Sequence, residues 1–291
     1  MIIIAATAWA VASCEVELKQ KVDVDHLPAM SPMLNVVSFI APGEPVMVEV
    51  FEVRPIVYNS PVERRRNDYG RVSTANVCLT CVSTGESFDL VYADSIYLCS
   101  GSQPDIVPGG EYRLSVEAKG FPLATARTVV PQGDFGFSHT DVQITPGRES
   151  SVRYSVRIAI DNKTANNQVF RVKTQTHDTF VDYILDTIGC PSCYSPDTVS
   201  RYRLLYDSFI VLPPSSSGFA VHTSERWDHS TFDTLRIDVM VVNEDYHKYH
   251  VSLDAASGTY YFIEGENMVS NVEGGQGVFG GYIRQVKYVV P

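Results

Sequence analysis

The stretch that decides the class of fold reads Val152-Arg153-Tyr154-Ser155-Val156-Arg157-Ile158-Ala159-Ile160. Apolar side chains stand at every second position, and the positions between them are polar or small. Successive side chains of a β-strand point to opposite faces, so this alternation predicts a strand with one buried and one solvated face. The pattern is typical of an antiparallel sheet and argues against a helix.

The same alternation recurs in both halves of the chain, at residues 46–51, 112–118 and 235–241. Proline and glycine mark the connections between such segments, because they supply the backbone angles of tight turns. These turn signals stand at Pro42-Gly43, Pro108-Gly109-Gly110, Pro146-Gly147 and Pro213-Pro214-Ser215. Short strands with frequent turns predict a β-sandwich or a β-barrel.

Two segments depart from the alternation. Apolar residues of segment 179–188 fall at helical spacing, and those of segment 244–256 line one helical face. Asp178 and Asn243 precede the two segments, where their side chains can cap the first backbone N–H groups of a helix. We therefore expect one or two short helices on the β framework.

The composition is that of a folded protein with room for two domains. The chain has 291 residues, of which 44% are hydrophobic and 20% charged, so it can bury a sizeable core. The turn residues at 131–134 predict a boundary between a domain at 33–132 and a β-rich domain at 133–291.

The charge of the chain argues against nucleic acid as a partner. The formal net charge is −11, and the densest basic run is Arg64-Arg65-Arg66. Binding to a phosphate backbone needs many cations spread over a surface, so we interpret this run as a solvated loop.

The N-terminus resembles the signal peptide of a bacterial lipoprotein. Residues 1–13 are uncharged and apolar, too short to span a bilayer but suited to the apolar core of a secretory signal. They end in Val11-Ala12-Ser13-Cys14, which resembles a lipobox. We expect cleavage before Cys14 and lipid on its thiol, and the alternative is a buried N-terminal strand. The usual basic opening is missing, which indicates an upstream start codon or an atypical peptide.

Residues 14–32 are polar and without period, and we interpret them as a tether behind the lipidated cysteine. Glu15 and Glu17 resemble the surface-export signals of Bacteroidota lipoproteins. We therefore expect a lipid-anchored protein of the outer membrane, on its periplasmic or its cell-surface face, with the surface favoured.

Five further cysteines follow, and outside the cytoplasm disulfides are their expected state. We expect a local Cys190–Cys193 bond and a bond from Cys99 to Cys78 or Cys81, which leaves one thiol unpaired. A zinc site from the two CxxC pairs is disfavoured, because 108 residues separate the pairs. Redox catalysis is disfavoured because reactive thiols stand at a helix N-terminus, whereas Cys190 follows the expected helix.

No residue pattern predicts a catalytic, metal or cofactor site. Gly275-Gln276-Gly277-Val278-Phe279-Gly280 matches GxGxxG, but no βαβ unit surrounds it. We interpret it as a tight glycine turn before a last strand at 282–290. His247 and His250 are three residues apart on the expected helix, yet no third metal ligand accompanies them. We expect surface or packed histidines.

The C-terminal part of the chain contains the segment Ser270-Asn271-Val272-Glu273-Gly274-Gly275-Gln276-Gly277-Val278-Phe279-Gly280-Gly281. This segment resembles the closing motif of a Bacteroidota lipoprotein family known as a domain of unknown function, number 4249, and segment 243–249 resembles the aromatic helix of that family. Segments 34–46, 107–116 and 124–131 are similar to its N-terminal strands. The residues that we assign to a structural turn of the closing motif are Asn271, Gly274, Gly275, Gly277, Phe279 and Gly280.

This resemblance implies a lipoprotein commonly encoded beside TonB-dependent transporters. It also implies an immunoglobulin-like β-sandwich at 33–132, followed by a second antiparallel β domain, and it carries over no catalytic residue. We expect a non-enzymatic binding or accessory partner of a TonB-dependent transport system, with an unknown ligand. The alternatives are a structural or adhesive cell-surface subunit and, third, an extracellular hydrolase with a carboxylate or Ser/His cluster in one cleft.

Overall fold

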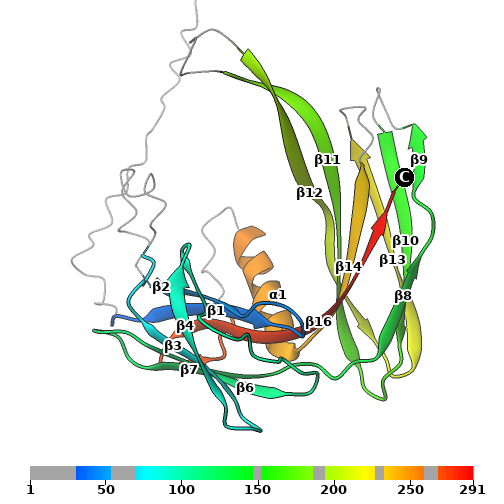
Figure 1. The fold of residues 1–291 in the computed structure, drawn as a ribbon. Coiled ribbons are helices and arrows are strands. Elements are labelled where there is room, and N and C mark those ends of the chain that lie inside the picture. Colours follow the sequence, from blue (N-terminus) through cyan, green and yellow to red (C-terminus); the bar gives the residue numbers. More distant parts are fainter. Residues whose placement is uncertain are drawn as a thin grey trace, which may run out of the picture.

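A computed structural model describes residues 31–53, 70–146, 152–185, 194–226, 233–258 and 268–290. Within these residues the protein is mainly β, as predicted (Figure 1). The strands are β1 Leu34–Ile40, β2 Met47–Glu52, β3 Asn76–Cys81, β4 Ser87–Ala93, β5 Ile96–Cys99, β6 Glu111–Glu117, β7 Ala124–Val129, β8 Phe135–His139, β9 Gln143–Pro146, β10 Val152–Asn162, β11 Gln168–Leu185, β12 Tyr194–Leu212, β13 Ser216–Arg226, β14 Thr234–Val242, β15 Val272–Glu273 and β16 Gln276–Val289, and the helix is α1 Glu244–Gly258.

The strands form one large mixed sheet and one smaller sheet. The large sheet has 12 strands in the order β12-β11-β14-β16-β1-β2-β5-β4-β3-β6-β7-β15. In the smaller sheet β10 lies between β13 and β8, and β9 pairs with the start of β10. β16 joins the two halves of the large sheet, because residues 276–281 pair in parallel with β1 and residues 282–289 pair antiparallel with β14.

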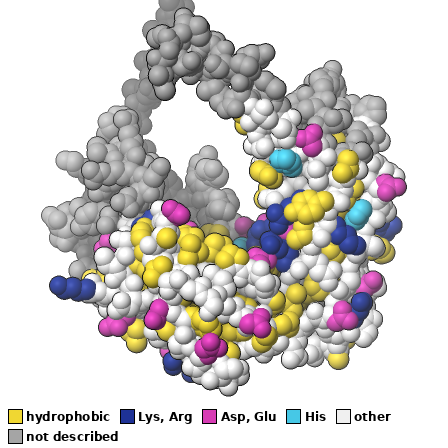
Figure 2. All heavy atoms as spheres, viewed as in Figure 1, with side chains coloured by type: hydrophobic (Ala, Val, Ile, Leu, Met, Phe, Trp, Pro, Cys, Tyr) yellow, Lys and Arg dark blue, Asp and Glu magenta, His cyan; other side chains and the backbone are white. Residues whose placement is uncertain are grey.

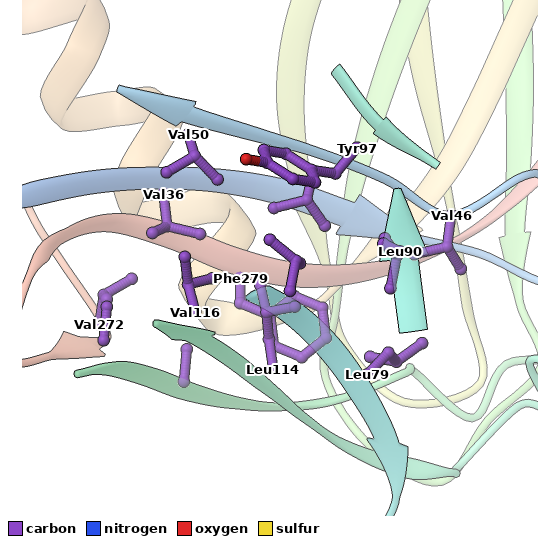
Figure 3. Close-up of a cluster of buried hydrophobic side chains, with 14 of the residues drawn as sticks. Val36, Val46, Val50, Leu79, Leu90, Tyr97, Leu114, Val116, Val272 and Phe279 are labelled. Carbon is purple, nitrogen blue, oxygen red and sulfur yellow. The ribbon is translucent and has the colours of Figure 1, made fainter. Parts of the chain in front are cut away.

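The first hydrophobic core lies between β1, β2 and β16 on one side and β3, β6 and β7 on the other (Figure 3). Val36 of β1, Leu114 and Val116 of β6, and Phe279 of β16 point into it and are buried. Burying a side chain of this size contributes about 1.5–3 kcal/mol. The C-terminal Phe279 therefore stabilises a core that is otherwise built mainly from residues before 131.

The second core lies between the smaller sheet and the C-terminal strands of the large sheet. Tyr154, Val156, Ile158 and Ile160 of β10 are buried in it, as the alternation predicts. Phe170 and Val172 of β11 meet them from the facing sheet, together with Ile237 and Val239 of β14. The two cores divide between Val130 and Phe135, and Val272 and Phe279 belong to the first. An immunoglobulin-like arrangement of 33–132 stays a prediction.

The expected helix at 179–188 is wrong for its described part. β11 runs as a strand to Leu185, and residues 179–185 pair with β12. A helical spacing of apolar residues over so few positions is ambiguous, and this segment is rich in β-branched and aromatic residues. Residues 186–188 lie outside the described residues.

The helix expected at 244–256 is confirmed as α1. Its cap is Asn243, whose Oδ1 accepts hydrogen bonds from the N–H groups of Tyr246 at 3.0 Å and Gly281 at 3.2 Å. The same amide donates to Thr128 Oγ1 at 2.7 Å. Asn243 thus starts the helix and joins it to β16 and β7.

The glycine segment 275–280 is not the tight turn that we expected before a strand at 282–290. The turn is confined to Gly274 and Gly275, and β16 already begins at Gln276. Gly277 has a φ of 110° and pairs with Val36 of β1. A Cβ at this position would overlap the carbonyl oxygen of Val36, so glycine allows the parallel strand to form.

Candidate functional site

One face of the strands β12, β11, β14 and β16 carries two groups of ion pairs. We call this side, which is turned away from the second core, the inner face. Strand pairing places its side chains in rows that cross the sheet. The first row is Phe209, Arg171, Met240 and Arg284, the second is Asp207, Lys173, Asp238 and Val286, the third is Leu204, Gln175, Arg236 and Tyr288, and the fourth is Tyr202, His177 and Thr234.

Arg171 is the buried centre of the first row. Its Nε and Nη2 donate to the two carboxylate oxygens of Asp207, both at 2.7 Å, and its Nη1 donates to the Tyr246 hydroxyl at 2.6 Å. Burial opposes the charge of Arg171, but its hydrogen bonds to Asp207 raise the pKa of the guanidinium. A bidentate ion pair of this kind holds both side chains in place.

A second ionic group crosses β14 and β16 and reaches the first half of the chain. The buried Asp238 accepts from Arg236 at 2.7 Å and lies 3.8 Å from Arg284. Arg284 also pairs with Glu44 at 2.7 Å, and Tyr282 donates its hydroxyl to the other Glu44 oxygen at 2.7 Å. Burial raises the pKa of Tyr282, so its hydroxyl stays protonated as the donor.

Lys173 is the least compensated cation of the inner face. Its Nζ is 3.6 Å from an Asp207 oxygen, but Arg171 already binds both oxygens of that carboxylate. Burial lowers the pKa of Lys173, and the charge of Arg171 lowers it further. In addition, the buried Nε of Arg236 has no hydrogen-bond partner among the described residues. Because that Nε is closed off, Lys173, whose side chain is 28% exposed, is the group with unused capacity for an incoming acceptor.

The balance of charges on the inner face differs from that of the chain. Among the described residues of this face, four cations meet three carboxylates. The cations are Arg171, Lys173, Arg236 and Arg284, and the carboxylates are those of Asp207, Asp238 and Glu44. The site carries an excess positive charge in a chain whose net charge is −11. Figure 2 shows Lys and Arg side chains gathered in this part of the molecule.

Large apolar side chains stand exposed in the third and fourth rows. Tyr202 is 69% exposed, Leu204 52% and Tyr288 66%. The ring of Tyr202 stacks on His177 with centroids 4.6 Å apart. Aromatic rings held open to solvent beside polar groups are common in binding surfaces, where they offer contact area at a low entropy cost.

α1 packs beside the first row of the inner face through a cluster of aromatic side chains. Tyr246 stacks on His250 at 4.3 Å and contacts Phe39 at 4.7 Å, while His247 meets Phe209 at 4.8 Å. Burial lowers the pKa of His250 to about 4. Among the described residues no group of three His, Cys, Asp or Glu side chains is placed to hold a metal ion.

The expected disulfide from Cys99 to Cys78 or Cys81 is wrong, because all three thiols are free. Cys78 and Cys99 pair with neighbouring residues of β4 from its two sides, so β4 separates them. Two strand spacings amount to about 10 Å, beyond the roughly 7 Å between bridged Cα atoms. Lying outside the described residues are Cys14, Cys190 and Cys193.

The residues of the closing motif have a structural role in the fold. Asn271 donates to the carbonyl of Phe279 at 2.9 Å and accepts from its N–H at 2.9 Å, which holds β16 beside the preceding turn. Gly274 has a φ of 72° in that turn. Gly275 and Gly280 have little space around them, because a Cβ at either position would press on neighbouring atoms.

An open pocket of about 300 Å³ lies beside this motif, on the outer side of β6, β7 and β15. Its lining residues are Arg113, Thr125, Ala126, Arg127, Asn271 and Glu273.

Sequence reasoning missed the inner face. A signal was present, since Val169, Arg171, Lys173, Gln175 and His177 alternate with the core residues of β11. Such alternation indicates which side chains share a face, but it does not indicate which strands lie beside them.

The fold and the inner face define a β-rich protein with an exposed aromatic and charged surface. The chain belongs to the family described as Domain of unknown function (DUF4249), whose model matches residues 18–287, and the resemblance of the closing motif is thereby confirmed. A search of curated proteins finds no match. No helix among the described residues is long and apolar enough to cross a membrane.

Three of the solved structures that match resemble this chain distantly. A mutant of Salmonella alpha-2-macroglobulin matches 91% of this chain and 15% of its own length, with 11% identity and a TM-score of 0.24. Trypsin-activated alpha-2-macroglobulin from Escherichia coli matches 74% of this chain and 15% of its own length, with 11% identity and a TM-score of 0.22. A putative membrane-anchored protein from Corynebacterium diphtheriae matches 74% of this chain and 55% of its own length, with 12% identity and a TM-score of 0.20.

Proposed function

We propose that the protein is a non-enzymatic outer-membrane lipoprotein that serves as a binding or accessory partner of a TonB-dependent transport system. The observation that carries the binding role is the inner face. Tyr202, Leu204 and Tyr288 stand open to solvent there, above a fixed set of ion pairs. A preorganised surface loses little entropy when a partner binds, which favours recognition.

The membrane part of the proposal rests on Cys14 and its surroundings. The lipobox Val11-Ala12-Ser13-Cys14 gives the thiol for a lipid anchor, and residues 14–32 give a tether of up to about 60 Å when extended. Such a tether lets the body reach the outer surface of a neighbouring β-barrel protein. We also propose an immunoglobulin-like arrangement for 33–132 and a local Cys190–Cys193 bond.

The test is a pull-down of the tagged full chain from detergent-solubilised outer membranes, with mass spectrometry of the captured proteins. We expect a β-barrel transporter to co-purify. The variant Cys14→Ala should leave the outer-membrane fraction and lose the transporter. Capture of no transporter by the anchored protein would contradict the accessory role.

Radiolabelled palmitate tests the anchor separately. The label should enter the wild-type chain and not the Cys14→Ala variant. Equal labelling of both chains, or no labelling of either, would refute lipidation at Cys14.

A structural or adhesive surface subunit is the second candidate, and one observation favours it. β12 pairs only with β11 among the described strands, so its other edge offers backbone N–H and C=O groups to a further strand. This candidate predicts self-association of the purified chain. Chemical cross-linking and size-exclusion chromatography would detect it, and a monomer that captures a transporter would exclude it.

A further inference from the structure

We propose that the inner face binds an acidic, extended segment of a partner protein, which lies across its second to fourth rows beside the open edge of β12. This inference rests on the accessory role proposed above, because it names the chemistry of the partner. It goes further in assigning the contact to Lys173, Arg236 and the exposed rings of Tyr202 and Tyr288.

Charge selects an anionic partner. Carboxylates of the partner would meet Lys173, whose ion-pair partner Asp207 is bound through both oxygens by Arg171. They would also meet the guanidinium of Arg236, whose side chain is 31% exposed. A positive site on a chain of net charge −11 attracts an acidic segment that the rest of the surface repels.

The second to fourth rows of the inner face are large enough to hold several residues of an extended chain. Four neighbouring strands span about 14 Å, and the five residues from Lys173 to His177 span about 13 Å along β11. An extended polypeptide advances about 3.3 Å per residue, so roughly four residues cross this area. Tyr288 of the third row and Tyr202 of the fourth row are exposed and can pack against the partner's side chains.

The edge of β12 favours a polypeptide over an acidic oligosaccharide. Tyr202 and Leu204 belong to β12, which among the described strands has β11 as its single partner. A segment that crosses the rows and then turns along β12 can add a further strand to this edge, which only a polypeptide can do through regular backbone hydrogen bonds. A carboxylated oligosaccharide would use the cations and the rings but not the edge.

The experiment measures fluorescence anisotropy of a labelled peptide on the purified full chain. The probe is a ten-residue peptide of alternating Glu and Tyr, and the comparison probes are its Glu→Gln version and a labelled polygalacturonate oligosaccharide. We expect the acidic peptide to bind most tightly, and its affinity to fall as NaCl is raised.

Two variants of the inner face and two matched controls locate the contact. Lys173→Gln and Tyr202→Ala should each weaken binding of the acidic peptide by about tenfold. The controls are Arg157→Gln and Phe219→Ala on β10 and β13, where Arg157 covers the Phe219 ring at 4.0 Å. They remove the same kinds of group from the smaller sheet and should change affinity by less than about twofold.

Equal binding of the neutral peptide, preference for the oligosaccharide, or unchanged affinity of both inner-face variants would overturn this inference. Failure of the accessory role would be seen in the pull-down and not in the peptide assay, because the wild-type chain would then capture no transporter. A transporter captured equally by wild type and by Lys173→Gln/Tyr202→Ala would leave the accessory role standing and reject this surface.

Discussion

At the scale of single residues, the closing motif shows how one missing side chain decides strand pairing. Gly277 combines a φ of 110° with close approach to the carbonyl of Val36. Both conditions exclude a Cβ, so the parallel pairing of β16 with β1 depends on glycine at this position.

Gly277→Ala should therefore be strongly destabilising. Backbone strain alone costs about 1–3 kcal/mol at such a position, and the overlap with Val36 adds to it. Chemical denaturation should show a lower free energy of unfolding by at least about 2 kcal/mol. The control is Gly101→Ala, where a Cβ would meet no atom within 4 Å and should change little. Similar losses in both variants would contradict the role of Gly277.

His250 should make stability depend on pH. Its folded-state pKa is about 4 against an ordinary value of 6.5, chiefly because burial disfavours the charged ring. The cations Arg171 and Lys173 lower this pKa as well, while the hydrogen bond to the Tyr246 carbonyl and the charge of Asp207 raise it. The unfolded chain therefore binds more protons between pH 6.5 and 4, and the contribution of neutral His250 to stability is lost as the pH falls through this window.

Thermal unfolding followed by circular dichroism should show a falling midpoint temperature from pH 6.5 to 4. The variant His250→Gln should flatten this part of the profile, since the amide does not titrate. Val251→Gln on the exposed side of α1 serves as the control, because it introduces the same amide without removing a titrating group, and it should keep the wild-type slope. A wild-type midpoint that stays constant over this range would reject the assignment.

At the scale of elements, α1 is joined to the sheets mainly by its cap and its aromatic side. Asn243 serves two neighbours at once, because its oxygen caps the helix and its amide nitrogen donates to Thr128. The sequence predicted the cap, since asparagine before an apolar helical face is a standard start signal. It did not predict the bond to β7, whose residue is 115 positions away.

Asn243→Ala should lower the free energy of unfolding by about 1–2 kcal/mol, through loss of the cap and of the bond to Thr128. Asn243→Asp keeps the accepting oxygen for Tyr246 and Gly281 but not the donor. It should lose less than the alanine variant when both are compared by urea denaturation. Equal losses would show that the cap contributes nothing beyond the bond to β7.

In β11, pairing with a neighbouring strand decides the secondary structure against the local spacing of apolar residues. Segment 179–188 has a helical spacing of apolar residues, yet its described part is a strand because β12 pairs along the whole length of β11. Local periodicity over ten residues cannot outweigh a continuous ladder of hydrogen bonds to a neighbouring strand.

At the scale of the whole molecule, β16 connects the two cores. Its first part contributes Phe279 to the first core, and its second part pairs with β14 at the edge of the inner face. A boundary drawn at residue 132 leaves this contribution out. The N-terminal half is thus completed by a segment from the end of the chain.

Residues 33–132 expressed alone should therefore fail to fold stably. They lack the parallel partner of β1 and leave the site of Phe279 open to water. Joining residues 268–282 to this fragment through a flexible Gly-Ser linker should restore a dispersed amide NMR spectrum. A dispersed spectrum from 33–132 without the added segment would contradict this role of β16.

The sequence by itself determined the mainly β class, the buried side of β10, the start of α1 and the family. All of these depend on short stretches of sequence, because the period of the side chains and the helix caps each involve only a few neighbouring residues. Only the tertiary structure decided the parallel pairing of β16, the free state of Cys78, Cys81 and Cys99, and the inner face. Tyr282 meets Glu44 across 238 positions and Arg171 meets Asp207 across 36. Such partners are set by which strands lie together, and that order follows from burial of the two cores as a whole.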